Sequence, residues 1–185
     1  MTMLSQVALA RYRKDVPPHR ANRADIPVAL SALLPDMFAL YLKTKNLHWH
    51  VSGLQLPGYH LLLDDQAAQI LTTTDLINER VRKLAGRTIT CIGYIGQLLD
   101  IENNDADELA PRDMLAELRK DNRLLAKRMK ETRTLCDERG DVVTASLVEN
   151  WIDEAEGRAW FLHDAALPGS FTDAANIHEN WPKFT

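Results

Sequence analysis

Cysteine is scarce in this chain, and its scarcity narrows the classes of protein to consider. The 185 residues include two cysteines, Cys91 and Cys136, with no Cys-x-x-Cys spacing. Two isolated cysteines disfavour a disulfide framework of the kind that holds small secreted domains together. They favour reduced thiols, which is typical of a cytoplasmic protein.

Long apolar runs are also missing. No stretch approaches the roughly 20 apolar residues of a membrane span, and the first six residues lack the basic-then-apolar pattern of a secretory signal. Strand-like alternation and internal repeats are absent as well. We therefore expect an all-α cytoplasmic protein without a membrane partner.

Charge is unevenly distributed along the chain. The net charge is −4, yet residues 1–25 hold five Arg or Lys against two Asp, so that the remainder carries about −7. Residues 1–25 are predicted to be a basic N-terminal tail, whose cations could anchor DNA phosphates without sequence preference. The alternative is an arm that only keeps the protein soluble. Residues 168–185 have no periodicity and are taken as a C-terminal extension.

Between these ends, residues 26–167 contain four long helical stretches. The spacing of apolar residues predicts helices over 27–50, 57–85, 111–139 and 141–166. Pro35 should kink the first, while Gly86 and Gly140 should end the second and third. The connection 87–110 has apolar residues enough for a short helix. The sequence thus predicts an all-α, ferritin-like four-helix bundle with a short extra helix between its second and third long helices.

Five potential metal ligands surround the second helix: His48, His60, Asp64, Asp75 and Glu79. With about 100° per residue, the last four share one helix face within roughly 100°. The pair His60/Asp64 nevertheless lies roughly 22 Å along the axis from the pair Asp75/Glu79. One metal centre therefore cannot use both pairs of the same helix.

A two-fold axis resolves this separation. Two such helices packed antiparallel bring the His60/Asp64 end of one opposite the Asp75/Glu79 end of the other, which creates two identical sites. His48, at the end of the preceding helix, can complete each site. The ligand set suits iron, although zinc, cobalt and manganese also accept nitrogen and oxygen ligands.

The same residues form a family pattern. His48, Trp49 and Gly53 are followed by His60 twelve residues after the first His, then by Asp64, Asp75 and the pair Glu79-Arg80. This pattern resembles the Dps miniferritins, the DNA-binding proteins from starved cells, and the likeness extends more loosely to about Leu167. A short helix in the middle connection is also a feature of that family.

The resemblance implies an iron-storage protein with ferroxidase activity. Its expected assembly is a hollow dodecamer that oxidises Fe(II), preferably with hydrogen peroxide, stores the ferric product and protects DNA. Trp49 is a candidate electron donor, with a packing role at the subunit contact as its alternative. Acidic candidates for the pores are Asp137, Glu138 and Asp141, and those for the cavity wall are Asp153, Glu154 and Glu156.

Two other functions stay open from the sequence. The chain could be a DNA-compacting protein that acts through its basic tail, in which case it would be associated with the nucleoid, or a helical assembly without catalysis. An ordinary ferritin site inside one bundle is disfavoured, because neither His48 nor His60 follows a Glu at the Glu-x-x-His spacing.

Overall fold

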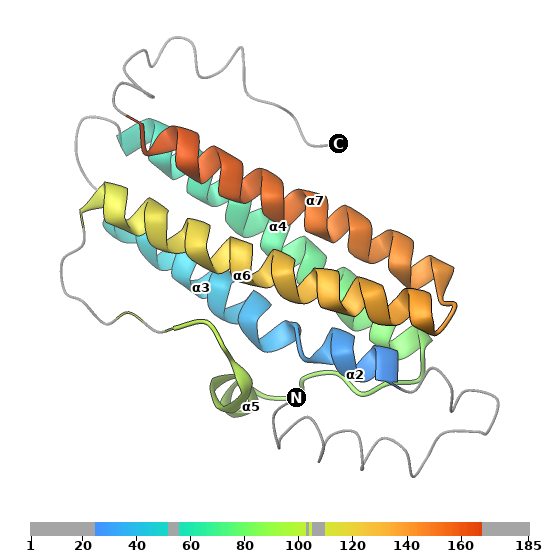
Figure 1. Cartoon of the computed structure of the whole chain (residues 1–185). Coiled ribbons are helices and arrows are strands. Elements are labelled where there is room, and N and C mark those ends of the chain that lie inside the picture. Colours follow the sequence, from blue (N-terminus) through green and yellow to red (C-terminus); the bar gives the residue numbers. More distant parts are fainter. Residues whose placement is uncertain (1–24, 52–55, 103, 105–109, 168–185) are drawn as a thin grey trace.

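The computed structural model describes residues 25–51, 56–102, 104 and 110–167. Four long helices run side by side: α3 (Leu34–His50), α4 (Leu56–Lys83), α6 (Pro111–Glu138) and α7 (Val142–Ala165) (Figure 1). Two short helices accompany them, α2 (Asp25–Ser31) and α5 (Ile92–Leu98). The predicted all-α bundle with a short helix in its long connection is confirmed. The predicted basic tail, the C-terminal extension and Gly53 lie outside the described residues.

The first predicted helix is divided, and Pro35 explains the division. We expected one kinked helix over 27–50, but the chain turns at Ala32 and Leu33 and restarts as α3. Pro35 sits in the first turn of α3, where its missing N–H leaves no hydrogen bond unmade. Further along a helix, its ring would clash with the carbonyl four residues earlier.

The end of α4 differs in one detail from the expectation. The residue with a left-handed backbone is Ala85, at φ 61°, and not Gly86. Gly86 donates its N–H to the carbonyl of Val81 at 2.8 Å, which closes the last turn. A Cβ atom at Gly86 would lie 2.6 Å from Cβ of Pro27, so that only glycine lets α2 approach here.

The helices pack as two antiparallel pairs around one apolar core. α3 lies against α4 and α6 against α7, while α2 continues the line of α3 (Figure 1). The core includes Trp151 and Met129 together with leucines from every long helix. By length and composition, Asp25–His50 could also cross a membrane, but half of its most apolar window is buried in the bundle. Its apolar residues therefore have a partner in the core.

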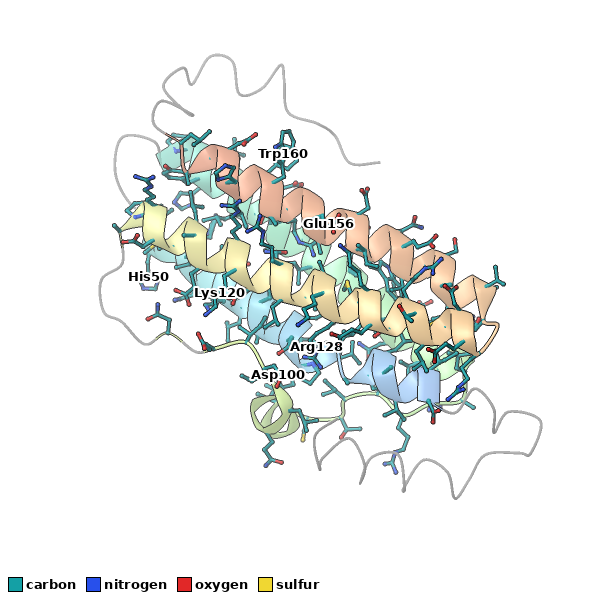
Figure 2. All side chains as sticks on the ribbon, viewed as in Figure 1. His50, Asp100, Lys120, Arg128, Glu156 and Trp160 are labelled. Carbon is teal, nitrogen blue, oxygen red and sulfur yellow. The ribbon has the colours of Figure 1, made fainter. Side chains whose placement is uncertain are left out.

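A buried carboxylate holds the segment after α5 against the bundle. Asp36, 1% exposed, accepts hydrogen bonds from the backbone N–H groups of Asp100 and Ile101 at 2.7 and 3.0 Å. It also pairs with Arg128 of α6, which contacts the Asp100 carboxylate at 3.1 Å (Figure 2). The long connection is thus tied to both α3 and α6.

The turn between α6 and α7 corrects one predicted pore residue. Asp141 caps α7 by accepting the N–H of Thr144 at 3.1 Å, and its side chain is 3% exposed. Arg80 of α4 donates to the same carboxylate at 3.0 Å. Asp141 is therefore a buried structural residue and cannot line a pore, whereas Asp137 and Glu138 next to it are exposed.

Candidate metal centre

The end of α3 and the start of α4 bring two of the predicted ligands together. Nε2 of His48 lies 2.9 Å from Nδ1 of His60, and the two rings meet edge to face with centroids 4.3 Å apart. His48 is the last-turn histidine of α3, and His60 lies in the first turns of α4. The packing of α3 against α4 thus brings the two imidazole rings into contact.

Asp64 joins this pair from the next turn of α4. Its Oδ2 atom is 3.3 Å from Nε2 of His48, and its Oδ1 atom accepts a hydrogen bond from Nζ of Lys45 at 2.5 Å. The hydrogen bond from the Lys45 ammonium group lowers the pKa of the Asp64 carboxyl. Asp64 is therefore an anion at neutral pH, as a metal ligand must be.

The environment of His48 keeps its imidazole neutral. Burial lowers the pKa of His48, and this effect outweighs the opposing attraction of Asp64. A neutral imidazole has a lone pair free for a metal ion. Nδ1 of His48 is buried without a hydrogen-bond partner in the described part of the chain. His48, His60 and Asp64 thus contribute two nitrogen donors and one carboxylate to what can be half of a cation site.

Asp75 and Glu79 lie at the other end of α4, away from this cluster. Both side chains are exposed, and Glu79 accepts a hydrogen bond from Lys83, one turn along, at 2.9 Å. Within the described residues of one chain, no three His, Cys, Asp or Glu side chains form a group that could hold a metal. The structure therefore holds two half-sites on one helix and brings only His48, His60 and Asp64 together.

Exposed apolar side chains occupy the same surface as the half-sites. Leu61, Leu71 and Leu76 of α4 are 43–45% exposed, and Leu42 and Trp49 of α3 are 59% and 60% exposed. On the helix, Leu71 lies between the directions of His60 and Asp64, near 20°. A solvated helix face has no need of these leucines, whereas a subunit contact does.

Comparisons with known proteins match this arrangement. A ferritin-like domain model matches residues 28–166. Antigen TpF1 of Treponema pallidum is 28% identical over 158 residues, which cover 85% of this chain and 89% of that protein. The DNA protection during starvation protein of Helicobacter pylori is 22% identical over 133 residues, which cover 72% of this chain and 92% of that protein.

The chain belongs to the Dps group of the ferritin-like family.

Solved Dps structures have the same fold. The TpF1 crystal structure superposes with a TM-score of 0.75 at 27% identity, covering 82% of this chain and 97% of that one. The Dps protein of Vibrio cholerae, described as a member of the ferritin-like diiron-carboxylate superfamily, superposes with a TM-score of 0.75 at 21% identity, covering 80% and 92%. The likeness thus spans the bundle of this Dps chain.

The bundle interior of this Dps protein carries a cation in place of a carboxylate cluster. Arg158 of α7 is 2% exposed, and its Nε atom donates to Oδ1 of Asn122 at 2.8 Å. Burial lowers the pKa of Arg158 to about 10, so that it remains charged at neutral pH. A buried guanidinium repels metal cations, which agrees with the missing Glu-x-x-His pairs. The sequence did not predict the burial of Arg158, because an arginine among the polar residues of α7 looks like a surface residue.

Lys45 is the site residue that sequence reasoning missed. It lies one helical turn before His48 on α3 and faces Asp64 across the helix pair at 2.5 Å. Its spacing of three residues from His48 was the available signal, since residues three apart share a helix face. A lysine beside a metal site is easily dismissed as a solvated charge.

Four further predicted residues have clear positions. Trp49 is 60% exposed at the end of α3, so its indole does not pack inside its own bundle. Arg80 turns away from the half-sites, where it donates to Thr144 Oγ1 at 2.8 Å as well as to Asp141. Glu154 accepts a hydrogen bond from Thr73 at 2.7 Å, and Glu156 pairs with Lys130.

Proposed function

We propose that this Dps protein binds and oxidises Fe(II) at a site that two copies of the chain form together. The main observation in support of this proposal is the exposed face of α4, where two complementary half-sites alternate with exposed leucines. An antiparallel copy would bring its Asp75 and Glu79 to the His48, His60 and Asp64 of the first chain. Burial of the leucines would stabilise that contact.

Each ligand has a defined task in the proposed reaction. His48 and His60 supply neutral nitrogen donors, while Asp64, Asp75 and Glu79 supply negative charge that favours Fe(III) over Fe(II). Asp64 and Glu79 are the carboxylates proposed to bridge two iron ions. Trp49, next to His48, is proposed as an electron donor when one iron alone is bound.

Hydrogen peroxide is the proposed oxidant. Two Fe(II) ions give one electron each to one peroxide, which takes up two protons and leaves as two water molecules. No hydroxyl radical is released in this two-electron step, and this would protect DNA. The Fe(III) product is proposed to be stored inside a hollow shell of twelve chains.

Related proteins are named for DNA protection during starvation. Direct DNA binding through residues 1–25 stays a prediction, since those residues lie mostly outside the described part.

The test is anaerobic loading with Fe(II) followed by a peroxide pulse. Wild-type protein should oxidise about two irons per peroxide, as the stoichiometry above requires, and Asp75→Ala/Glu79→Ala should lose this rapid phase. A matched control, Asp113→Ala/Glu131→Ala, removes two exposed carboxylates from α6 and should retain it. Equal rates in the wild type and in Asp75→Ala/Glu79→Ala would refute the shared site.

A further inference from the structure

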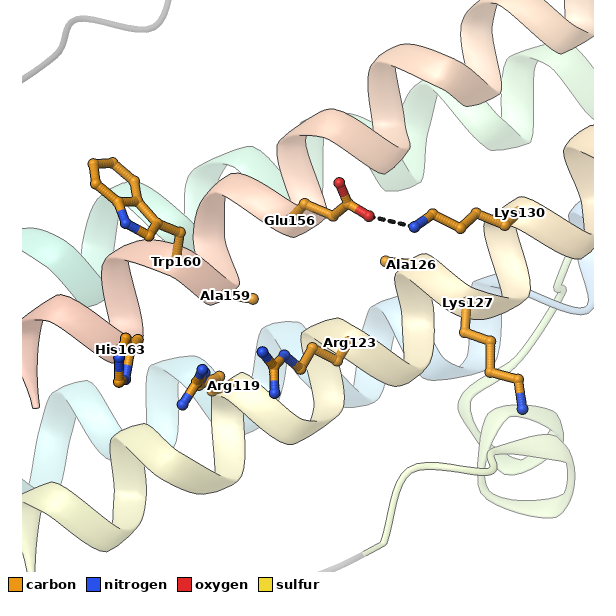
Figure 3. A pocket seen from close by; sticks show the side chains of 9 residues that line it. All are labelled: Arg119, Arg123, Ala126, Lys127, Lys130, Glu156, Ala159, Trp160 and His163. Carbon is orange, nitrogen blue, oxygen red and sulfur yellow. Dashed lines mark hydrogen bonds and ion pairs between the residues drawn. The ribbon is translucent and has the colours of Figure 1, made fainter.

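A second polar site lies on the other helix pair, in the groove between α6 and α7. The groove has a volume of about 440 Å³ and is lined on the α6 side by Arg119, Arg123, Lys127 and Lys130 (Figure 3). α7 contributes Glu156, Trp160 and His163. The groove is independent of the proposed iron site, which involves α3 and α4.

Most of the positive charge in this groove has no carboxylate partner among the residues that the structure describes. Among the described residues, Glu156 is the single carboxylate that lines the groove, and Lys130 pairs with it at 2.5 Å (Figure 3). Arg119, Arg123 and Lys127 make no ion pair with any carboxylate in the described ranges of the chain. Three other cations of α6 are paired: Lys120 with Glu102, Arg128 with Asp36, and Arg133 with Glu149.

The spacing of these cations costs stability unless an anion binds. Arg119, Arg123 and Lys127 follow each other at four-residue intervals, which places like charges one turn apart on a single stripe. Moreover, Nε of the half-buried Arg119 is shielded from solvent and has no partner in the described part. An oxyanion in the groove would supply both the missing acceptor and the missing negative charge.

Trp160 indicates which kind of oxyanion fits. Its indole is 57% exposed at the edge of the groove and contacts Phe161, with ring centroids 4.6 Å apart. An exposed aromatic ring beside a row of cations matches a ligand with a planar base and phosphate groups, because bases stack on tryptophan while arginine and lysine bind phosphates. The volume lies within the range of small-ligand pockets, which runs from about 300 to 1,000 Å³.

We propose that the α6–α7 groove binds a nucleotide, with its phosphates on Arg119, Arg123 and Lys127 and its base on Trp160. The nucleotide could be a free nucleoside polyphosphate or one unit of a single-stranded nucleic acid. Both sources present the same chemistry to the groove, and the experiment separates them.

The test is fluorescence anisotropy of an N-methylanthraniloyl derivative of ATP on the full chain, in EDTA so that no metal bridges ligand and protein. Arg119→Gln/Arg123→Gln should weaken binding at least roughly tenfold, since hydrogen bonds to charged groups are lost. Trp160→Ala should weaken it roughly fivefold or more through lost stacking. Arg119→Lys/Arg123→Lys, which retains the charge, should retain more of the affinity than the glutamine variant.

The matched control is Arg112→Gln/Lys120→Gln, which removes two positive charges from α6 outside the groove and should leave the affinity unchanged. Circular dichroism should show that every variant is folded. Competition with unlabelled ATP, inorganic triphosphate and a twelve-residue oligothymidylate then identifies the source. Tighter binding of ATP assigns a free nucleotide, and tighter binding of the oligonucleotide with the same variant pattern assigns a strand.

Three results would overturn the proposal. Inorganic triphosphate that competes as well as ATP would show that no base is recognised. Equal weakening by the groove variant and by the control would show a general effect of charge. Undetectable binding by folded wild-type protein would mean that the groove is covered or unused.

Discussion

Lys45 occupies the position at which a metal ion would compete for Asp64. Its ammonium group holds the Asp64 carboxylate at 2.5 Å on the side opposite His48. The ion pair keeps Asp64 charged and oriented, but a cation that binds Asp64 must share or displace this partner. At the scale of single residues, Lys45 would therefore compete with a metal ion at the proposed site.

Replacing Lys45 should tighten binding of a divalent cation. Lys45→Met removes the competing charge, and because exposed ion pairs contribute about 0.2–1 kcal/mol, the gain should be up to roughly fivefold in affinity. Co(II) titration followed by its visible absorption bands measures this without any oxidation. Lys120→Met, which breaks an exposed pair with Glu102, is the control and should leave Co(II) affinity unchanged. Weaker binding in Lys45→Met would mean that Lys45 mainly positions Asp64.

The two cysteines should differ in reactivity. Cys91 is exposed, whereas Cys136 is buried and its pKa is raised to about 11, chiefly by burial. Because the thiolate is the reactive form, Cys136 should stay inert at pH 8 and below. Iodoacetamide should label one thiol per native chain, at Cys91 by peptide mapping, and two after denaturation. Rapid labelling of Cys136 in the native protein would contradict this burial.

At the scale of elements, the ends of the helices carry much of the specificity of the fold. The α6–α7 turn depends on Gly140, at φ 63°, and on the Asp141 cap, which also binds Arg80 of α4. One carboxylate thus fixes the start of α7 and joins it to the opposite helix pair. Sequence reasoning found the helix boundary but assigned Asp141 to a pore.

Removing this carboxylate should destabilise the protein. Asp141→Ala loses the cap of α7 and leaves the guanidinium of Arg80 without its carboxylate, which together should cost about 2–3 kcal/mol. Thermal unfolding by circular dichroism should show the loss as a lower midpoint. Asp137→Ala at the exposed neighbouring position should shift the midpoint far less. Similar midpoints for both variants would rule out the structural role of Asp141.

At the end of α4, substitutions at two adjacent positions should change the stability of the protein in opposite directions. Ala85→Gly should stabilise the protein by about 1 kcal/mol, because alanine is strained at positive φ and glycine is not. Gly86→Ala should destabilise it, since the new Cβ would lie 2.6 Å from Pro27 and 2.7 Å from Val81. Urea unfolding of both variants measures the sign of each change in the free energy of unfolding. A stable Gly86→Ala variant would mean that α2 can move away from α4.

At the scale of the whole molecule, the proposed iron site requires two chains. The leucines of α4 are exposed in one chain, and Asp75 and Glu79 lie at the opposite end of α4 from His60. A second, antiparallel chain would bury these leucines and would also bring its histidines to Asp75 and Glu79. The proposed iron site and the proposed assembly therefore depend on one contact.

A charge placed in that contact should separate the chains. Leu71→Asp buries a carboxylate at the centre of the α4 face, which is costly without a partner. Sedimentation velocity should show wild-type protein as an assembly and the variant as smaller species, with loss of the rapid peroxide reaction. Asn150→Asp, an exposed polar position of α7, is the control. A fully assembled Leu71→Asp variant would exclude the α4 contact.

The sequence by itself determined the helices and the identity of the candidate ligands. Apolar periodicity specifies helix spans because each helix must bury one stripe, and the spacing from His48 to Glu79 specifies one face of α4 because an α-helix has a fixed rise and rotation. The same helix geometry separates the two half-sites along α4. These are local consequences of chain geometry, and local geometry can be read from one sequence.

Tertiary structure alone decided which charges meet. Lys45 reaches Asp64, Arg80 reaches Asp141, and Arg158 lies buried among the helices, because α3, α4, α6 and α7 pack at particular heights and rotations. Periodicity cannot supply these pairings, since a charged residue has the same helical phase whether its partner is water or a carboxylate of another helix. Arg119, Arg123 and Lys127, which have no ion pair among the described residues, likewise share a groove with Trp160 only because α6 and α7 pack together.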